Sequence, residues 1–402
     1  MFNKRFTAKA VPLTVVLSTA IMVSSSSFAR SNVYADFPIT LKDYSGSATT
    51  STSYKGQMAR HALESSLKKL ISKGDMSAMQ SYYSGDDANR AIIAPATKGD
   101  FVIMQSTIGE LSNKNLSGKT YKGLIPGWPG NMTGPEVAQF MFEKAADSEG
   151  GYDAAHAYDY TQLVSKFLMG AVTYNQAVDN YLDEKLEADT KPNNKPYKDG
   201  AAYTGKEHVW DEAFGYFGAP SHTLTLSAQN VYDIAKQKDV TVADYNYDGK
   251  VDLYKEMAFG HAYYASSFDK GGKTTYLHDI VGAYMDGRDM LVAADGKALT
   301  DSQRDQLKAY AQVIKTNWEK VIAEAVFKYA GSTYKDMMKI EAILESGGDV
   351  AKEWRNYSKH WGELKGFALA LQVAGKDMGA TSVKLNRLIG YSPLLLGNTQ
   401  VT

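Results

Sequence analysis

The spacing of apolar residues restricts the fold of this chain more than any other feature. In several separate stretches, apolar side chains recur three and four residues apart, which places them on one face of an α-helix. Sustained alternation of apolar and polar residues, the pattern of a half-buried β-strand, is not convincing anywhere, and runs of β-branched residues are rare. We therefore predict an all-α fold made of two packed helical bundles. The helical stretches span residues 58–70, 137–145, 158–186, 313–329 and 354–371.

Local signals mark the ends and the connections of these helices. Thr133 is followed three residues later by Glu136, and Thr300 by Gln303, as in the capping box that begins many helices. Residues 191–200 are rich in Pro, Asn and Gly, which is typical of a loop.

The chain is long for one simple core, so we predict two helical subdomains. The first spans residues 56–235, and the second spans residues 236–402 and begins with a loop rich in Asp and Asn. Residues 36–55 contain a Ser-, Thr- and Gly-rich stretch without apolar periodicity, which predicts a flexible N-terminal segment.

Residues 1–35 have the order of zones that is typical of a secretory signal peptide. A basic start precedes a mostly apolar run over residues 11–23, which is too short to span a membrane, and residues 24–29 are mostly small. Cleavage fits after Ala29 or after Ala35, and we favour Ala35 because the composition changes directly after it. An uncleaved anchor is the alternative. The pattern predicts a periplasmic or secreted protein of a bacterial envelope.

Cysteine is absent from the sequence. Its absence excludes disulfides, thiolate metal sites, a cysteine nucleophile and a lipoprotein anchor. Removal of residues 1–35 would take away four basic residues and no acid, so the formal charge would change from −1 to −5. A mildly acidic surface argues against nucleic acid as a partner. No later stretch is apolar enough for a membrane-spanning helix, so we expect no membrane span after cleavage.

The sharpest local motif resembles the first part of a calcium-binding loop. Oxygen donors alternate along it, Gly249 permits the tight curl, and the carbonyl of Lys250 would be a further ligand. The twelfth position is Lys255 instead of glutamate, and Glu256 follows one residue late. The alternative is an Asx-rich turn that caps a helix starting near Leu253. The predicted Ca²⁺ ligands are Asp244, Asn246, Asp248, Lys250, Asp252 and Glu256.

A second candidate site lies in the segment 207–218. On a helix, His208, Asp211 and Glu212 share one face, because they are three and four residues apart. Imidazole and carboxylate groups together can bind iron or another divalent metal, or another ligand. The alternative is a buried hydrogen-bonded pair of a histidine and an acid.

His360 and Glu363 repeat the combination of a histidine with an acid three residues later. If the two halves of the chain are distant copies of one unit, both histidine segments could meet in a central cleft. The segment around His360 is therefore predicted to supply partners for the first one.

The common sequence motifs of hydrolases and nucleotide-binding proteins are absent, among them His-Glu-x-x-His, Gly-x-Ser-x-Gly and the P-loop. The sequence nominates no catalytic nucleophile, and a non-enzymatic role is favoured.

Several motifs occur together that resemble the bacterial family described as domain of unknown function 4856. The resemblance covers nearly the whole chain after residue 35 and implies no settled activity. It rests on Asp36-Phe37-Pro38, Tyr54-x-Gly56-Gln57-Met-Ala-Arg60, Lys166-x-x-Met169-Gly170-Ala171, the segment 208–218 and the Asp/Asn loop.

The segment Gly205-x-x-His208-x-x-Asp211 is also similar to the imelysin motif Gly-x-His-x-x-Glu, which is followed by an apolar stretch ending in Phe/Trp-Gly. It has one extra residue, and aspartate stands in place of glutamate unless Glu212 substitutes for it. The resemblance implies an exported helical protein of two related bundles, linked to iron uptake in the bacterial envelope.

Three hypotheses follow for the function. The first is an exported, non-enzymatic protein that binds a metal or a ligand in iron acquisition, together with an uptake protein of the periplasm or outer membrane. The second is a calcium-stabilised interaction module that docks on an outer-membrane partner through exposed tyrosines, of which the chain has 27 in all. The third is a hydrolase of an unrecognised type.

Overall fold

The computed structural model describes residues 32–187, 190–374 and 378–396. The predicted basic start, the apolar run and the cleavage site after Ala29 lie outside these residues. The described residues form twelve α-helices and one hairpin of two-residue strands, so the predicted all-α class is confirmed. None of these helices combines the length and the apolar character needed to cross a membrane.

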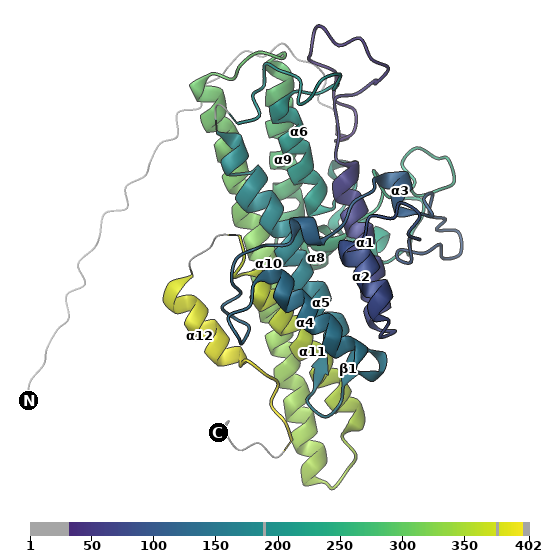
Figure 1. Ribbon diagram of the computed structural model, residues 1–402, viewed down its shortest axis with the longest axis vertical. Helices are drawn as coiled ribbons and strands as arrows, with labels where there is room; N and C mark the ends of the chain where they lie inside the picture. The colour runs from purple at the N-terminus through teal and green to yellow at the C-terminus, as the bar shows by residue number, and fades with distance from the viewer. Residues whose placement is uncertain (1–31, 188–189, 375–377, 397–402) are drawn as a thin grey trace, which may run out of the picture. The chain divides into compact units, whose positions relative to one another are not determined.

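The helices differ widely in length, and α10 has 45 residues, which corresponds to about 67 Å. Figure 1 shows it running alongside α9 and α11. The α-helices are α1 (Lys55–Ile71), α2 (Met76–Ser84), α3 (Ile108–Leu111), α4 (Gly134–Ala146), α5 (Tyr160–Leu168), α6 (Gly205–Phe217), α7 (Ala228–Ala235), α8 (Gly260–Asp269), α9 (Tyr276–Ala293), α10 (Asp301–Glu345), α11 (Ala351–Ala370) and α12 (Gly379–Ile389). The strands are β1 (Tyr152–Asp153) and β2 (Tyr158–Asp159), which pair antiparallel.

The predicted helix starts are confirmed in detail. Capping boxes of Thr133 with Glu136 and of Thr300 with Gln303 begin α4 and α10. A further capping box, of Thr204 with Glu207, begins α6. The long helix predicted over 158–186 is α5 continued by π-helical turns over Met169–Tyr174 and Gln176–Tyr181. Local sequence therefore decides where these helices begin.

Missing side chains let α5 and its continuation approach α11 closely. A Cβ atom added at Gly366 would lie 2.6 Å from the Cβ of Lys166, and one at Gly170 would lie 2.3 Å from the Cβ of Ala370. Both separations are far below a van der Waals contact, so any side chain at either glycine would push the helices apart. The close approach brings Lys166 next to the residues of α11.

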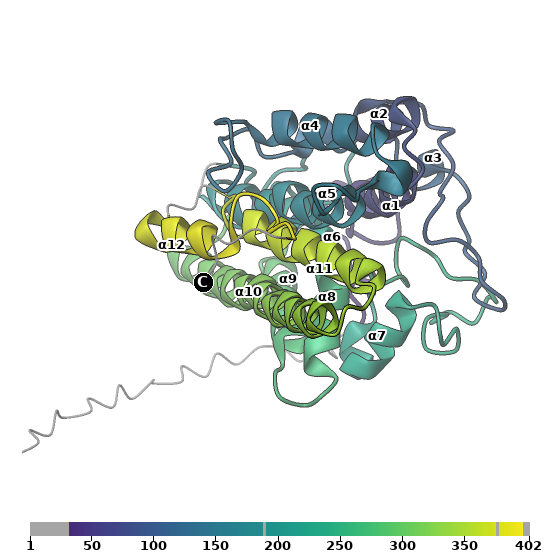
Figure 2. The same ribbon diagram turned by 90° about the horizontal axis from the view of Figure 1, so that it is seen from below.

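One continuous apolar core runs from Tyr34 to Ala374 and includes residues of both predicted subdomains. The described residues belong to a single compact unit, and Figure 2 shows helices of both halves layered against one another, with α5 and α11 in contact. The division near residue 235 stays a prediction.

The segment 36–55 differs from the predicted flexible segment. Phe37, Ser51 and Tyr54 are each 3% exposed or less. Ser51 donates a hydrogen bond to the carbonyl of Pro38, and its backbone N–H donates to the carbonyl of Phe37. The hydroxyl-rich composition thus satisfies backbone groups in a packed segment, which composition alone did not distinguish from a tether.

Candidate functional site

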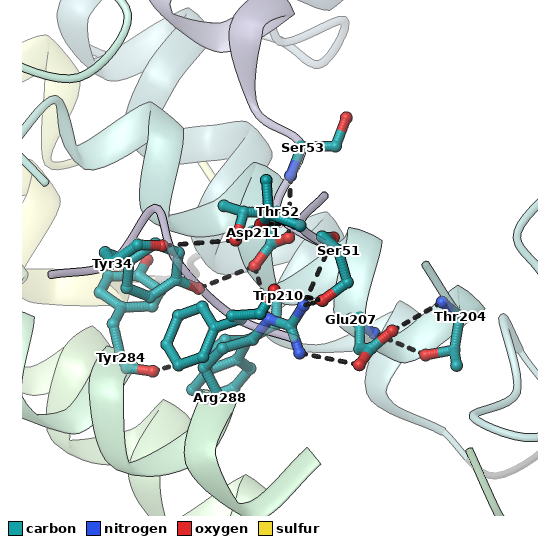
Figure 3. Close-up of polar contacts among 12 residues, drawn as sticks. Tyr34, Ser51, Thr52, Ser53, Thr204, Glu207, Trp210, Asp211, Tyr284 and Arg288 are labelled. Atoms are coloured by element: carbon teal, nitrogen blue, oxygen red, sulfur yellow. Dashed lines mark hydrogen bonds and ion pairs between the residues drawn. The ribbon is translucent and has the colours of Figure 1, made fainter. Parts of the chain in front are cut away.

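Arg288 of α9 lies at the centre of a fully buried ion-pair network (Figure 3). Its guanidinium donates to Oε1 of Glu207 and to Oδ1 of Asp211, each at 2.9 Å, and also to the hydroxyl of Ser51. Tyr34 donates its phenol proton to the same Asp211 oxygen at 3.1 Å. We call Tyr34, Ser51, Glu207, Asp211 and Arg288 the Arg288 network.

The second oxygen of each carboxylate in this network is also hydrogen-bonded. Oδ2 of Asp211 accepts from the backbone N–H of Ser53 at 3.0 Å, and Oε2 of Glu207 accepts from the backbone N–H of Thr204 at 2.8 Å. Burial raises the pKa of Asp211 to about 6, and Arg288 limits that rise. Both Asp211 oxygens are thus occupied by Arg288, Tyr34 and Ser53, and the structure does not place Asp211 beside His208 as a shared ligand pair.

Neither Arg288 nor Tyr34 was predicted from the sequence as a site residue. Arg288 lies 77 residues from Asp211 in sequence, and Tyr34 lies 177 residues from it. Tyr34 is fully buried, and its ring stacks on Phe214 with centroids 3.7 Å apart. The one sequence feature that could have indicated a buried role for Tyr34 is its aromatic ring, close to the favoured cleavage position.

His208 and Glu212 do lie together, on the half-buried face of α6. Nε2 of His208 is 3.7 Å from Oε2 of Glu212, and their side chains are 12% and 16% exposed. Gln57 of α1 donates to the other Glu212 oxygen at 2.7 Å. The imidazole is covered by two phenol rings, Tyr203 at 4.6 Å and Tyr197 at 4.1 Å between centroids.

Electrostatics keep His208 neutral near pH 7. Burial lowers the pKa of His208, although the Glu212 carboxylate partly opposes this effect. The Nδ1 atom of His208 is buried and has no hydrogen-bond partner among the described residues. Burial also lowers the pKa of Lys185, whose ammonium lies 3.9 Å from the ring centre of Tyr181. The region therefore combines one neutral imidazole and one carboxylate with an aromatic wall.

His360 is engaged with a different acid. Its Nδ1 atom lies 2.5 Å from Oδ2 of Asp336, which projects from α10. The His360 ring is 6.2 Å from the ring of Tyr329. No contact joins His360 to His208 within the described ranges, and Figure 1 places α6 and α11 toward opposite ends of the long axis. The contacts of the two histidines give no support to a shared site.

Glu363 belongs to a second buried group of charges. Its side chain projects from α11 and is 6% exposed, yet its carboxylate makes no hydrogen bond or ion pair with another described residue. It acts through space on Lys68 and on the phenols of Tyr264 and Tyr329. We call Glu64, Lys68, Lys166, Tyr264, Tyr329 and Glu363 the Glu363 cluster.

Five helices meet at the Glu363 cluster, namely α1, α5, α8, α10 and α11. Ser165 donates to Glu64 at 2.8 Å, and the phenol oxygens of Tyr264 and Tyr329 are 3.2 Å apart. The ammonium of Lys166 lies 5.4 Å from the ring centre of Tyr264. Polar side chains from distant parts of the chain thus converge in the interior.

Burial dominates the titration of this cluster. It raises the pKa of Glu64, and the Lys166 ammonium and the Ser165 hydroxyl partly offset that rise. Burial, together with the neighbouring Lys166 charge, lowers the pKa of Lys68 to about 7. The cluster can therefore change its charge near neutral pH. Glu64 and Lys68 were not predicted from the sequence, although both lie on α1, the helix that carries the apolar stripe from residue 58.

The predicted calcium loop is tightly curled by its own side chains. The Asp244 carboxylate accepts from the backbone N–H groups of Asp248 and Gly249 at 3.1 and 2.9 Å. Asn246 and Asp248 accept from the N–H groups two residues further on, both at 2.9 Å. Gly249 has φ +82°, which requires glycine for an unstrained backbone.

Glu256 reaches back into this loop despite its late position. Its Oε1 accepts from the N–H of Tyr245 at 3.1 Å, and its Oε2 accepts from the N–H of Asp252 at 2.8 Å. Glu256 as a whole is 3% exposed. The described residues contain no group of three or more His, Asp or Glu side chains placed as metal ligands. Any Ca²⁺ ligand set would therefore have to include carbonyl and amide oxygens.

Together, the helical fold and the two charge clusters define a class of protein: an all-α protein whose interior contains two groups of buried charged side chains. The chain belongs to the family described as Domain of unknown function (DUF4856), whose model matches residues 55–382. No curated protein and no solved structure matches the chain.

Proposed function

We propose that the protein is an exported, non-enzymatic envelope protein that binds a small ligand or a metal in iron acquisition, and that the Glu363 cluster is its binding site. The observation that carries this proposal is the Glu363 carboxylate, which is 6% exposed and has no hydrogen bond or ion pair among the described residues. Its charge is balanced through space by Lys68 of the same cluster, while its oxygens accept no hydrogen bond from a described residue and remain available to donors of a ligand.

The balance of charge favours a ligand with both signs over a bare cation. Glu64 and Glu363 are matched by Lys68 and Lys166 in the same cluster. A small molecule with ammonium and carboxylate groups could pair with both signs, whereas a cation would gain from the acids and lose to the lysines. The phenols of Tyr264 and Tyr329 add donors and acceptors that fix orientation.

The link to iron rests on the similarity of the segment 205–218 to the imelysin motif. His208 and Glu212 supply an imidazole and a carboxylate on one helix face, a combination that suits iron. With Asp211 bound to Arg288, this pair would need ligands from elsewhere to complete a metal site.

The test is to identify what the protein carries when it is purified from its own cells. Native mass spectrometry and elemental analysis are applied to the wild type, to Glu363→Gln and to the matched control Glu345→Gln, which changes an exposed glutamate at the end of α10. We expect a stoichiometric small molecule or metal in the wild type and the control, and at least a tenfold reduction in Glu363→Gln. Wild-type protein that carries neither would contradict the proposal.

A calcium-stabilised interaction module is the second candidate. The observation that favours it is Glu256, whose carboxylate closes the loop 244–252 from one residue beyond the usual position. Tyr247 is 87% exposed at the tip of this loop and would be available to a partner. A lone loop of this kind would stabilise the fold rather than act as a switch.

Calcium binding is tested by thermal unfolding with excess Ca²⁺ and with chelator. We expect Ca²⁺ to raise the melting temperature of the wild type and of Asp305→Asn, a control on the exposed face of α10. Asp248→Asn should lose this response. Identical melting curves of the wild type in Ca²⁺ and in chelator would rule out the calcium candidate.

Export with cleavage of a leader is part of the first proposal, and the buried position of Tyr34 supports cleavage after Ala29. Val33, Tyr34 and Ala35 are 7%, 0% and 2% exposed, and the N–H of Tyr34 donates to the carbonyl of Ser221 at 2.9 Å. Cleavage after Ala35, which we favoured from composition, would remove Tyr34 from the Arg288 network. The intact mass of the exported protein distinguishes the two sites.

A further inference from the structure

Helix α10 carries an exposed apolar stripe along its C-terminal half. Phe327, Tyr334 and Met338 are 78%, 64% and 47% exposed, although large apolar side chains are normally covered. Spacings of seven and four residues place them on one face of the helix. Ala323 and Ala330 are exposed on the same face. Figure 2 shows α10 at the margin of the described helices.

The stripe has small residues at its centre. A Cβ atom added at Gly331 would meet no atom within 4 Å, so packing within the chain does not require glycine there. Because Ala330 and Gly331 are small, another helix can approach the backbone of α10 closely at this position.

Opposite charges end the stripe. Lys320 lies seven residues before Phe327, and Glu341 lies seven residues after Tyr334, so both continue the same face. Each is exposed and forms no hydrogen bond or ion pair with another described residue. The stripe from Lys320 to Glu341 spans 22 residues, or about 33 Å.

We propose that this stripe pairs with the same stripe of a second copy of the chain, antiparallel about a two-fold axis between Ala330 and Gly331. In this register Phe327 lies level with the second copy's Tyr334, and Lys320 lies level with the second copy's Glu341. Because a two-fold contact is reciprocal, both charged ends are neutralised at once. A parallel pair would set lysine against lysine and glutamate against glutamate.

The size of the stripe sets the expected strength. A strip about 33 Å long and about 10 Å wide covers about 330 Å² per copy, compared with about 800 Å² per partner in a stable complex. The dimer is therefore weak and depends on protein concentration, so its detection needs concentrated protein or covalent capture.

The absence of cysteine from the sequence makes covalent capture selective. The variant Gly331→Cys places one thiol next to the proposed axis, and Lys339→Cys places one on a different face of the same helix as a matched control. Under mild oxidation we expect Gly331→Cys to form a disulfide dimer at least tenfold faster than the control. Equal rates would overturn the proposal.

A charge exchange tests the register. Lys320→Glu and Glu341→Lys alone should each weaken the dimer about tenfold, measured by analytical ultracentrifugation, because two symmetry-related pairs become repulsive. The double variant should restore wild-type association, which a folding defect would not do. The proposal would be overturned if the wild type stays monomeric at every concentration and disulfide formation at residue 331 is no faster than in the control.

Discussion

Glu207 and Glu363 are both buried glutamates, but their surroundings differ. Each Glu207 oxygen accepts hydrogen bonds, and Arg288 compensates its charge at 2.9 Å. Glu363 has neither kind of partner among the described residues, although Lys68 and Lys166 are near it. A fully paired network stabilises one conformation, whereas an incompletely paired one retains capacity for a ligand. The comparison therefore separates a structural cluster from a candidate binding site.

The largest effect is expected where the paired network is broken. Glu207→Gln removes one of the two charges that compensate Arg288, which is fully buried. We expect a loss of about 3 kcal/mol in the free energy of unfolding, measured by urea denaturation, because both Glu207 oxygens accept hydrogen bonds and the amide nitrogen of glutamine would face one of these buried donors. Arg387→Ala on the exposed face of α12 serves as the control. A loss below about 1 kcal/mol would contradict the prediction that the Arg288 network stabilises the fold.

Removal of the N-terminal contribution to this network should have a similar effect. A chain that begins at Asp36 lacks Tyr34, whereas one that begins at Asn32 retains it. We expect the shorter chain to be less stable by about 3 kcal/mol, since a buried aromatic side chain and its hydrogen bond are lost. Tyr34→Phe in the longer chain should lose only about 1 kcal/mol. Equal stability of the two chains would support cleavage after Ala35.

The pH dependence of stability tests the Glu363 cluster. The folded pKa of Lys68 is about 7, below its unfolded value, so the unfolded chain binds more protons between the two values. Stability attributable to Lys68 therefore rises with pH above 7, by about 2 kcal/mol between pH 7 and pH 9, and is lost as pH falls through 7. Denaturation curves of Lys68→Met should show a smaller rise. An identical pH profile in the variant would contradict the lowered pKa.

The smallest effect is expected at Glu363 itself. Glu363→Gln keeps the size of the side chain and removes a charge that is balanced only through space, by Lys68 of the same cluster. We expect a change within about 1 kcal/mol in ligand-free protein, in either direction. A loss as large as that of Glu207→Gln would show that Glu363 is structurally paired, and the difference between the two clusters would disappear.

The elements set by local interactions were predictable. The apolar spacing that gives α4, α10 and α11 is visible in the sequence, and so are the capping boxes at Thr133 and Thr300, because both depend on residues within about one helical turn. That His208 and Glu212 share one face of α6 was predicted for the same reason, since residues four apart lie on one helix face.

The environment of each charged side chain was decided only by the tertiary structure. Asp211 and Glu212 are adjacent in sequence, yet one lies in the Arg288 network and the other beside His208 and Gln57. Arg288, Tyr34 and Lys166 come to their partners through helix packing across many residues, including the close approach that Gly366 allows. The sequence determined the helices and their buried faces, because those depend on neighbours along the chain. Whether a buried charge is paired depends on which distant residue lies opposite, and only the packed fold decides that.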